Sequence, residues 1–321
     1  MSNWNLPPKG GYMEAPKKMY YQTMTKLDVE ERLKKDDVII SPVGSTENHG
    51  AAGPIGEDTF MVTRIAEMVA EKTGCTVAEP FWYGSHPFHH IGQPCTIPLP
   101  DSVFIDMLRA VITGFWNTGF RKQIFISLHG QEYSLPVALQ EWGKKYQVPA
   151  MLYFVDIPRV MGQTLMDKAH GGPYDRPFQH ACEAEQSLSL ALFPELCQQD
   201  KAENTETKGF LPAGHVDRGG DIYGYPIPGH CQVGNCGIEC VTFPEGVLGH
   251  AKDADPKKAV ASIEKTCDYL VKLHDDILKA FPAGQLPPAE LMSQRDPEEI
   301  EKLLKGPLKG GKHIYTLGWP T

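Results

Sequence analysis

Glu47 and His49 have the residue types and spacing of a metal-binding pair. They lie two residues apart directly after the β-branched run DDVIISPVGS, so in an extended chain their side chains leave on the same side. Asp58 follows at the start of a predicted helix, where a carboxylate is placed to bridge two ions. Because carboxylate and imidazole groups suit Zn, Mn and similar divalent ions, these three residues predict a metal centre.

Two later segments carry further candidate ligands. His129 ends the run KQIFISL, and Gly130 after it lets the backbone turn or approach closely. Glu185 lies near the start of another predicted helix, with His180 just before its first turn. We expect this helix to lean over the same strand ends, which would bring both side chains toward His129.

The elements that position these residues alternate between strands and helices. The strands are too apolar to have a solvated face, which predicts an α/β fold in a single domain, with a largely parallel central sheet flanked by helices on both sides. Ligands of such sheets gather beyond the carboxyl ends of the strands, where both histidine-bearing loops fall. Strands that lead into loops are expected within 36–45 and 122–130, a short strand within 76–84 and a further strand at 149–155. Helices are expected at 58–73, 101–118, 134–147, 181–193 and 256–280.

The predicted domain organisation is an N-terminal arm (1–35), a metal-hydrolase domain (36–281) and a C-terminal extension (282–321). The arm is rich in Pro, Gly and Lys, so we expect it to be irregular and to pack on a neighbouring subunit. The Gly- and Pro-rich segment 208–250 is expected to form extended loops that wall a pocket.

Composition excludes several classes of function. The 321 residues are 41% hydrophobic and 22% charged, which is ordinary for a globular protein. The net charge of -9, without a basic stripe, argues against nucleic acid as a partner. Because neither a secretory signal nor a membrane-spanning run is present, we expect a cytoplasmic protein with a small-molecule substrate. No GxGxxG follows the first strand, which argues against a metal-free oxidoreductase.

Several motifs together resemble those of the creatininase family. The segment PVGSTENHGAAGPIGED (42–58) resembles the family signature, whose usual form is PxGSxEQHGPHLPLxTD. HGQE (129–132) stands at the place of HGGN, HACEAEQS (180–187) at that of HAGxxETS, and QPCTI (93–97) at that of fPGTI. The resemblance covers roughly 36 to 265, and it implies a creatininase-like fold.

The resemblance also implies roles for the candidate residues. Two divalent ions per chain are expected, Zn and/or Mn, with Fe as a further option. Glu47, Asp58 and His129 would hold one ion. His49 and Asp58 would hold the other, completed by Glu185 or by Glu132; Glu185 is favoured, because Gln131 occupies the place of the carboxylate of creatininase itself. His180 corresponds to the proposed proton shuttle, and Glu132 is a second catalytic candidate.

The implied reaction is attack by a metal-activated water on a carbonyl of a small, polar, cyclic substrate. Ring opening of a dehydro-inosose at a C–C bond, in inositol catabolism, is favoured; the alternative is an amidohydrolase acting on a cyclic amide or formamide such as creatinine. A non-catalytic metal-binding assembly subunit is the alternative of another class. The family also implies a homo-oligomer, a hexamer.

Departures from the usual motifs and a group of histidines leave the identity of the substrate undetermined. Ala52, Cys95, Cys182 and Gln186 depart from the usual motifs, and none of them removes a predicted ligand. For His86, His89 and His90 in GSHPFHHIG, a structural or pocket-lining role is preferred over metal ligation.

Overall fold

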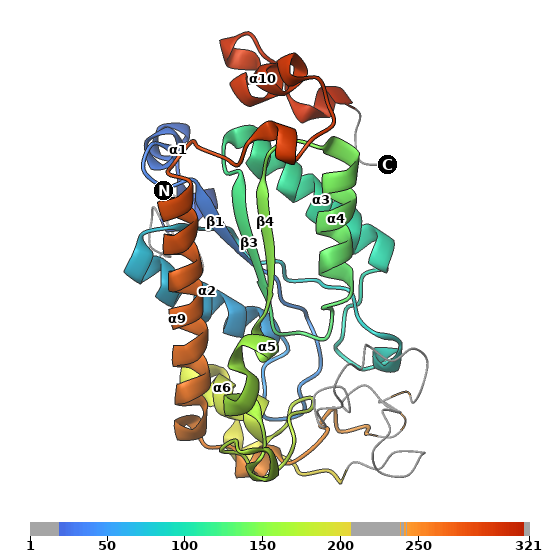
Figure 1. Cartoon of the computed structure of the whole chain (residues 1–321). Helices are drawn as coiled ribbons and strands as arrows, with labels where there is room; N and C mark the ends of the chain where they lie inside the picture. Colours follow the sequence, from blue (N-terminus) through green and yellow to red (C-terminus); the bar gives the residue numbers. More distant parts are fainter. Residues whose placement is uncertain (1–18, 207–237, 239–240, 242, 318–321) are drawn as a thin grey trace, which may run out of the picture.

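The central sheet has four parallel strands in the order β2-β1-β3-β4. It was seen in a computed structural model that describes residues 19–206, 238, 241 and 243–317 (Figure 1). The register pairs Val38 of β1 with Lys122 of β3, and Lys122 with Met151 of β4. The predicted parallel sheet is confirmed. The strands are β1 (Val38–Pro42), β2 (Thr76–Val77), β3 (Lys122–Ser127) and β4 (Met151–Asp156).

Helices cover both faces of this sheet. One face packs against α2 and α9, with residues of α5 and α6 in the same hydrophobic cluster, and the other packs against α3 and α4 (Figure 1). The helix α10 lies beyond one end of the sheet and joins the second cluster (Figure 1). In the described part of the chain the α-helices are α1 (Lys26–Leu33), α2 (Glu57–Thr73), α3 (Asp101–Thr118), α4 (Ser134–Tyr146), α5 (Ile157–Met161), α6 (Glu183–Leu192), α9 (Pro256–Ala280) and α10 (Pro297–Lys305).

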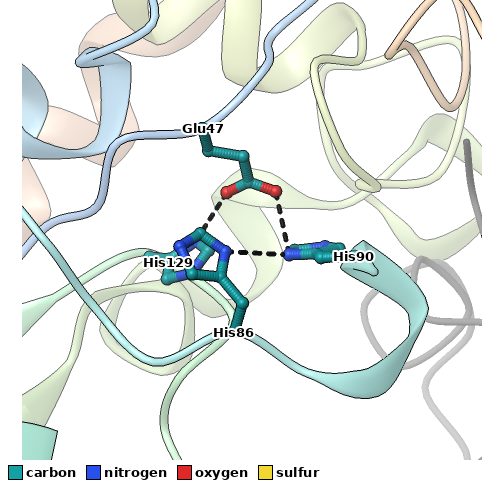
Figure 2. A group of neighbouring side chains, drawn as sticks. All are labelled: Glu47, His86, His90 and His129. Atoms are coloured by element: carbon teal, nitrogen blue, oxygen red, sulfur yellow. Dashed lines mark hydrogen bonds and ion pairs between the residues drawn. The ribbon is translucent and has the colours of Figure 1, made fainter. Parts of the chain in front are cut away.

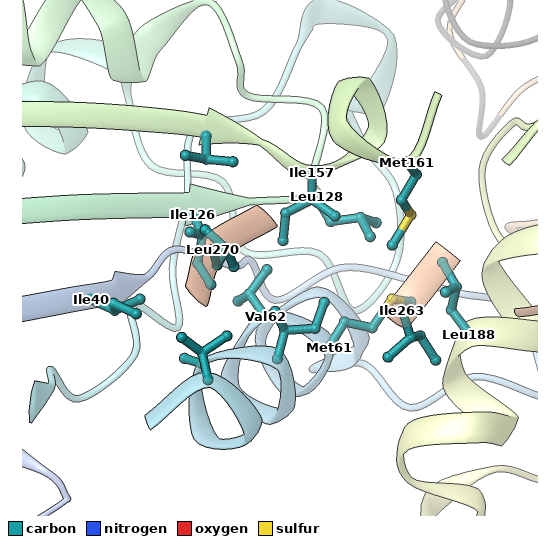
Figure 3. Packing of buried hydrophobic residues seen from close by; sticks show 14 of the residues in the cluster. Ile40, Met61, Val62, Ile126, Leu128, Ile157, Met161, Leu188, Ile263 and Leu270 are labelled. Atoms are coloured by element: carbon teal, nitrogen blue, oxygen red, sulfur yellow. The ribbon is translucent and has the colours of Figure 1, made fainter. Parts of the chain in front are cut away.

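Strands β1 and β3 are buried on both faces, since successive side chains point to opposite sides and helices cover both. Ile124 and Ile126 of β3 pack in the cluster that contains α2 and α9, whereas Phe125 between them packs in the cluster that contains α3 and α4. Figure 3 shows the first cluster, with Ile126 near Leu270 of α9. This double burial explains why the strands read as continuous apolar runs.

Most predicted elements are found close to their expected bounds. The helix α3 covers the predicted 101–118, and α2 begins one residue before its predicted start. Gly74 ends α2 in the left-handed conformation, with φ of 80°, which glycine adopts without steric cost. Strand β1 stops at Pro42, so Glu47 and His49 belong to the loop beyond its carboxyl end.

The prediction of an irregular N-terminal arm is wrong for residues 26–33. They form α1, which begins with a capping box: the Thr25 side chain accepts from the Asp28 amide, and the Asp28 side chain accepts from the Thr25 amide. Val29 of α1 packs with Ile39 and Phe120. Residues 1–18 lie outside the described residues, and the expected packing on a neighbouring subunit stays a prediction.

The structure describes most of the C-terminal extension (282–321) but little of the segment 208–250. In the C-terminal extension, Ile300 and Leu303 of α10 are buried in the same cluster as α3 and α4. The loops expected over 208–250 lie mostly outside the described residues. Among the helices that are described, none has the length and apolar character needed to cross a membrane.

A buried histidine, His274, pairs with two aspartates and makes the free energy of unfolding depend on pH. His274 Nε2 lies 3.0 Å from Asp36 Oδ2, and Nδ1 lies 2.8 Å from Asp275 Oδ1. Burial alone would lower the pKa of His274, but these two carboxylates outweigh it and raise the pKa above its usual value. A group whose pKa is raised in the folded state contributes stability to the protein. This contribution is fully present below the pKa of the unfolded state, about 6.5 for histidine, and is lost as the pH rises through the pKa of the folded state.

His274→Gln is therefore expected to destabilise the protein most at acidic pH. The difference in unfolding free energy between wild type and variant should be largest near pH 6 and should narrow at higher pH, because wild type then loses the charged pair. Urea unfolding of both proteins at a series of pH values measures this. A difference that stays constant with pH would show that the pair has no linked proton.

Candidate metal centre

The predicted ligands come together beyond the carboxyl ends of β1 and β3. Glu47 and His49 lie in the loop after β1, Asp58 lies in the first turn of α2, and His129 lies two residues beyond β3. All four side chains are buried. Because β1 and β3 are parallel neighbours, the loops that follow them meet at one edge of the sheet.

The distances between these side chains are those of a compact cluster. His129 Nδ1 lies 2.8 Å from Glu47 Oε2 and 3.2 Å from Asp58 Oδ2. His49 Nε2 lies 3.7 Å from Asp58 Oδ1. The Ser45 hydroxyl donates to Asp58 Oδ2 at 2.6 Å, which holds that carboxylate between the two histidines.

Backbone carbonyls fix the tautomers of both histidines. His129 Nε2 lies 3.2 Å from the Ser85 carbonyl oxygen, and His49 Nδ1 lies 3.2 Å from the carbonyl oxygen of Glu47. A carbonyl oxygen only accepts, so these nitrogens carry the hydrogens. The opposite ring nitrogens then face carboxylates, an arrangement that needs a proton or a cation between them. Metal-binding histidines are commonly oriented in this way.

His180 shows the same pattern from a different part of the chain. Its Nε2 donates to the Asn48 carbonyl oxygen at 2.7 Å. Its Nδ1 faces two carboxylates, 3.7 Å from Glu47 Oε1 and 4.0 Å from Glu185 Oε2. Glu185 itself accepts from the Ala181 amide. The segment before α6 therefore leans over the strand ends, as its position in the sequence indicated.

The charges of the cluster favour a bound cation. Four carboxylates are buried here, those of Glu47, Glu57, Asp58 and Glu185. Burial raises the pKa of Glu57 to about 7, against the pull of His49. Burial alone would lower the pKa of His49, but the carboxylates of Glu57 and Asp58 outweigh it and raise the pKa to about 10. The site thus draws positive charge, because buried carboxylates are costly without a partner.

Several polar atoms at the centre also lack hydrogen bonds among the described residues. They are His49 Nε2 and both carboxylate oxygens of Glu57, all buried. Buried polar atoms in folded proteins nearly always have a partner, so such atoms indicate a missing one. The donor set of carboxylate oxygens and imidazole nitrogens fits a divalent ion such as Zn or Mn.

Two histidines join the cluster that the sequence did not assign to it. His90 Nδ1 lies 3.0 Å from Glu47 Oε1, and His86 Nδ1 lies 3.2 Å from His90 Nδ1 (Figure 2). With Glu47 and His129 they form a group whose candidate ligand atoms all lie within 4.8 Å of one another. His90 ends the 3-10 turn η3 (Phe88–His90) in a loop without periodicity, so no local pattern could have placed it.

Further groups of the same kind extend the cluster. Glu47, His49 and His180 form one group, and His49, Glu57 and Glu185 form another. The first two groups share Glu47 and the last two share His49. The candidate ligands therefore form one connected cluster, with His86 at one end and Glu185 at the other. Glu57 was missed because an acidic residue in the first turn of a helix is a common favourable interaction with the helix dipole.

Glu132 is the one predicted site residue that the structure does not bring to this cluster. Like Asp58, it belongs to none of the three groups found among the described residues, but Asp58 contacts His129 and His49. Glu132 instead lines a pocket of about 640 Å3 with Asp156, Arg159 and Lys265. The preceding residue, Gln131, is fully buried and donates its side-chain amide to the Gly44 carbonyl oxygen at 3.0 Å. The HGQE loop therefore supplies His129 alone to the cluster.

Comparison with known proteins settles the family. Residues 22–274 match the family described as creatininase, creatinine amidohydrolase. The chain belongs to the creatininase family. As a creatininase-family protein it is a hydrolase, and the resemblance seen in its motifs is confirmed.

Two curated relatives of this creatininase-family chain differ greatly in similarity. A 3-dehydro-scyllo-inosose hydrolase of Thermotoga maritima is 54% identical over 307 residues, which is 95% of this chain and 99% of the relative. A creatinine amidohydrolase of Pseudomonas putida is 25% identical over 218 residues, which is 61% of this chain and 80% of the relative.

Solved creatininase structures share the fold. A manganese creatininase superposes with a TM-score of 0.63 at 20% identity, covering 85% of this chain and all of that one (100%). A creatininase variant of the Zn-Zn type gives a TM-score of 0.61, also at 20% identity, over 85% of this chain and 100% of the other. The creatininase-like fold expected from the sequence is confirmed.

Proposed function

We propose that this chain is a metal-dependent hydrolase that opens the ring of a 3-dehydro-scyllo-inosose at a C–C bond, in inositol catabolism. The substrate rests on the Thermotoga maritima relative, whose 54% identity extends over nearly the full length of both chains. Metal dependence rests on one observation: His49 and His129 donate one ring nitrogen to a backbone carbonyl and turn the other toward buried carboxylates.

The proposed centre holds two divalent ions, Zn and/or Mn, with Fe as a further option. Glu47, Asp58 and His129 hold one ion, and His49, Asp58 and Glu185 contribute to the other. The three groups of candidate ligands contain Glu47, His129, His49 and Glu185, and they support a centre of this extent. Asp58 lies outside these groups, but its carboxylate is 3.2 Å from His129 and 3.7 Å from His49. Bound ions of this kind supply Lewis acidity toward a carbonyl and lower the pKa of water toward neutrality.

The proposed reaction requires a proton to move between the attacking water and the leaving carbon. The oxygen of water bonds to one carbonyl carbon of the cyclic diketone, and the bond from that carbon to its neighbour breaks. The electron pair stays on the neighbouring carbon, stabilised by the second carbonyl, until that carbon takes a proton. The product is an open-chain carboxylic acid that keeps the other carbonyl.

His180 is the proposed proton carrier. Its Nε2–H is held by the Asn48 carbonyl oxygen, so only Nδ1 is available for the transfer. Nδ1 lies between the carboxylates of Glu47 and Glu185, at the side of the cluster that the α6 segment covers. An imidazole in this place accepts a proton from water and returns it to carbon.

The proposal is tested by measuring metal content and turnover together. The purified protein, the same protein treated with a chelator, and that protein reloaded with Mn²⁺ or Zn²⁺ are assayed with 3-dehydro-scyllo-inosose, creatinine, a formamide and a lactam. We expect about two ions per chain and metal-dependent ring opening of the diketone. A higher kcat/KM on creatinine would replace the proposal with amide hydrolysis. Full metal occupancy without any turnover would favour the non-catalytic assembly subunit.

His180→Ala is expected to lower kcat by about 10²- to 10⁴-fold while metal content stays near that of wild type. The reason is that His180 supplies a proton path, whereas Glu47, Asp58 and His129 hold the ion. Steady-state kinetics and elemental analysis of the same preparation measure both quantities. The control is His250→Ala, because His250 pairs with Glu206 and Asp253 outside the three ligand groups. Loss of metal in the His180 variant would make this residue a ligand instead.

The proposed assembly is a homo-oligomer, a hexamer, as the family resemblance implies. Sedimentation velocity of the full chain measures it directly. A monomeric profile at micromolar concentration would remove this part of the proposal and leave the metal centre unaffected.

A further inference from the structure

Glu57 is a buried carboxylate whose two oxygens make no hydrogen bond among the described residues. It is the first residue of α2, directly before Asp58, and none of its surface is exposed. Ser189 lies close enough to lower its pKa, yet neither carboxylate oxygen makes a hydrogen bond of ordinary length and angle. An unpaired buried carboxylate is costly, so a group at this position requires another explanation.

The side chains near Glu57 are of residue types that bind metal ions. One atom each from His49, Glu57 and Glu185 lie within 4.8 Å of one another. His49 Nδ1 donates to the Glu47 carbonyl oxygen, so the lone pair is on Nε2, which is buried without a hydrogen bond. The Ala181 amide donates to Glu185 and fixes its carboxylate at the same place. Two carboxylates and one imidazole form a donor set that suits Zn or Mn.

The backbone of this chain makes room for Glu57. A Cβ atom on Gly53 would lie 2.0 Å from Glu57 Oε2, so any other residue there would displace the carboxylate. In the usual form of the motif quoted above, leucine stands at the position of Gly53 and threonine at that of Glu57. This chain differs at both positions, and the two differences are sterically coupled.

The second position after His129 holds an amide and not a carboxylate. This residue is Gln131, and its side-chain amide donates to the Gly44 carbonyl oxygen at 3.0 Å. A Cβ atom on Gly84 would lie 2.4 Å from Gln131 Oε1, so the amide oxygen is packed against the backbone there. Gln131 is therefore held as a structural link between loops.

We propose that Glu57 is a ligand of the second ion, together with His49 and Glu185, and takes the place of the carboxylate that Gln131 does not supply. This inference rests on the proposed two-ion centre and assigns a residue that the motif comparison leaves out. Because Glu57 precedes Asp58 in α2, one helix turn then presents carboxylates to both ions.

The test is a comparison of metal binding in two Glu57 variants. Glu57→Gln keeps the size of the side chain and removes its charge; Glu57→Thr introduces the residue of the usual motif and guards against misfolding of the first variant. Each protein is stripped with a chelator and titrated with Mn²⁺ and, separately, Zn²⁺ by calorimetry. Bound ions per chain are then counted by elemental analysis, and circular dichroism checks the fold.

Wild type is expected to bind about two ions per chain. The Glu57 variants are expected to retain about one, or to bind the second at least about tenfold more weakly. Glu183→Gln is the matched control, because Glu183 is a buried carboxylate in the first turn of α6 that pairs with Lys258 and lies outside the ligand groups. It should bind both ions as wild type does. Second-ion binding in both Glu57 variants within less than about tenfold of wild type overturns the assignment.

Metal binding separates this inference from the proposed function. If wild type binds two ions, the Glu57 variants lose one, and the diketone is not hydrolysed, then the ligand assignment holds and the proposed substrate fails. If wild type hydrolyses the diketone and the variants bind both ions unchanged, then the proposed function holds and the role of Glu57 fails.

Discussion

Replacing His129 with alanine is expected to reduce kcat/KM by about 10³-fold or more and to remove at least one ion per chain. His129 Nδ1 lies 2.8 Å from Glu47 and 3.2 Å from Asp58, so its loss takes away the imidazole that these two carboxylates share. A metal ion contributes several kcal/mol to charge stabilisation in such reactions, and each 1.4 kcal/mol corresponds to about tenfold in rate.

The experiment combines kinetics, elemental analysis and a folding measurement on His129→Ala. The fold should be retained, because β3 and its packing lie before this residue and His129 itself belongs to the loop. His170→Ala is the control: His170 also pairs with an aspartate, Asp167, but is more exposed and outside the ligand groups. A His129 variant with wild-type turnover would show that the centre described here does not carry the reaction.

Much of the fold could be predicted because its local patterns agree with its tertiary contacts. The apolar runs that become β1 and β3 are buried on both faces, and such runs occur in parallel sheets covered by helices. Gly74 and Gly119 end α2 and α3 at the predicted places, because positive φ values there suit glycine. The position of Glu47 and His129 at neighbouring strand ends follows from the same topology.

The remainder of the site depends on loop conformation, which local patterns do not determine. His90 reaches Glu47 through the turn η3, and neither its spacing nor its neighbours indicate the direction of that turn. In HGQE, the sequence alone does not show which of Gln131 and Glu132 turns inward. The structure buries Gln131 in hydrogen bonds to the backbone and leaves Glu132 in a separate pocket.

Glu57 illustrates a different difficulty. An acidic pair at a helix start is explained by the helix dipole alone, so apart from the family motif nothing in the sequence distinguishes Glu57 from Asp58 as a ligand. The distinction appears only in three dimensions, where Asp58 accepts from Ser45 and Glu57 has no such donor. The prediction of an irregular arm was wrong at residues 26–33 for the opposite reason. The capping box there is a local signal for a helix, but the Pro- and Gly-rich composition of the arm as a whole pointed to irregular structure.

The opposite end of the sheet carries a buried ion pair that concerns stability rather than chemistry. Lys122, the first residue of β3, is fully buried, and its Nζ donates to Asp37 Oδ1 at 2.7 Å. The same Nζ donates to the carbonyl oxygens of Phe281 at 2.6 Å and Pro282 at 3.0 Å. Asp37 Oδ2 accepts from the Gly284 amide at 3.1 Å, so the pair ties the chain after α9 to the sheet.

Lys122→Met is expected to lower the free energy of unfolding by about 3–5 kcal/mol, because it leaves Asp37 buried without its partner. Methionine keeps most of the side-chain volume, so the loss is electrostatic rather than a cavity effect. The double variant Asp37→Asn/Lys122→Met removes the uncompensated charge and should recover part of the loss. Urea unfolding of metal-free wild type, single variant and double variant measures these differences.

The metal content and kcat of the folded single variant should stay within about twofold of wild type. The reason is that the interaction removed lies far from the strand ends that carry the ligands. A loss of under about 1 kcal/mol, or a double variant less stable than the single one, would mean that the charge pair between Lys122 and Asp37 does not stabilise this end of the sheet.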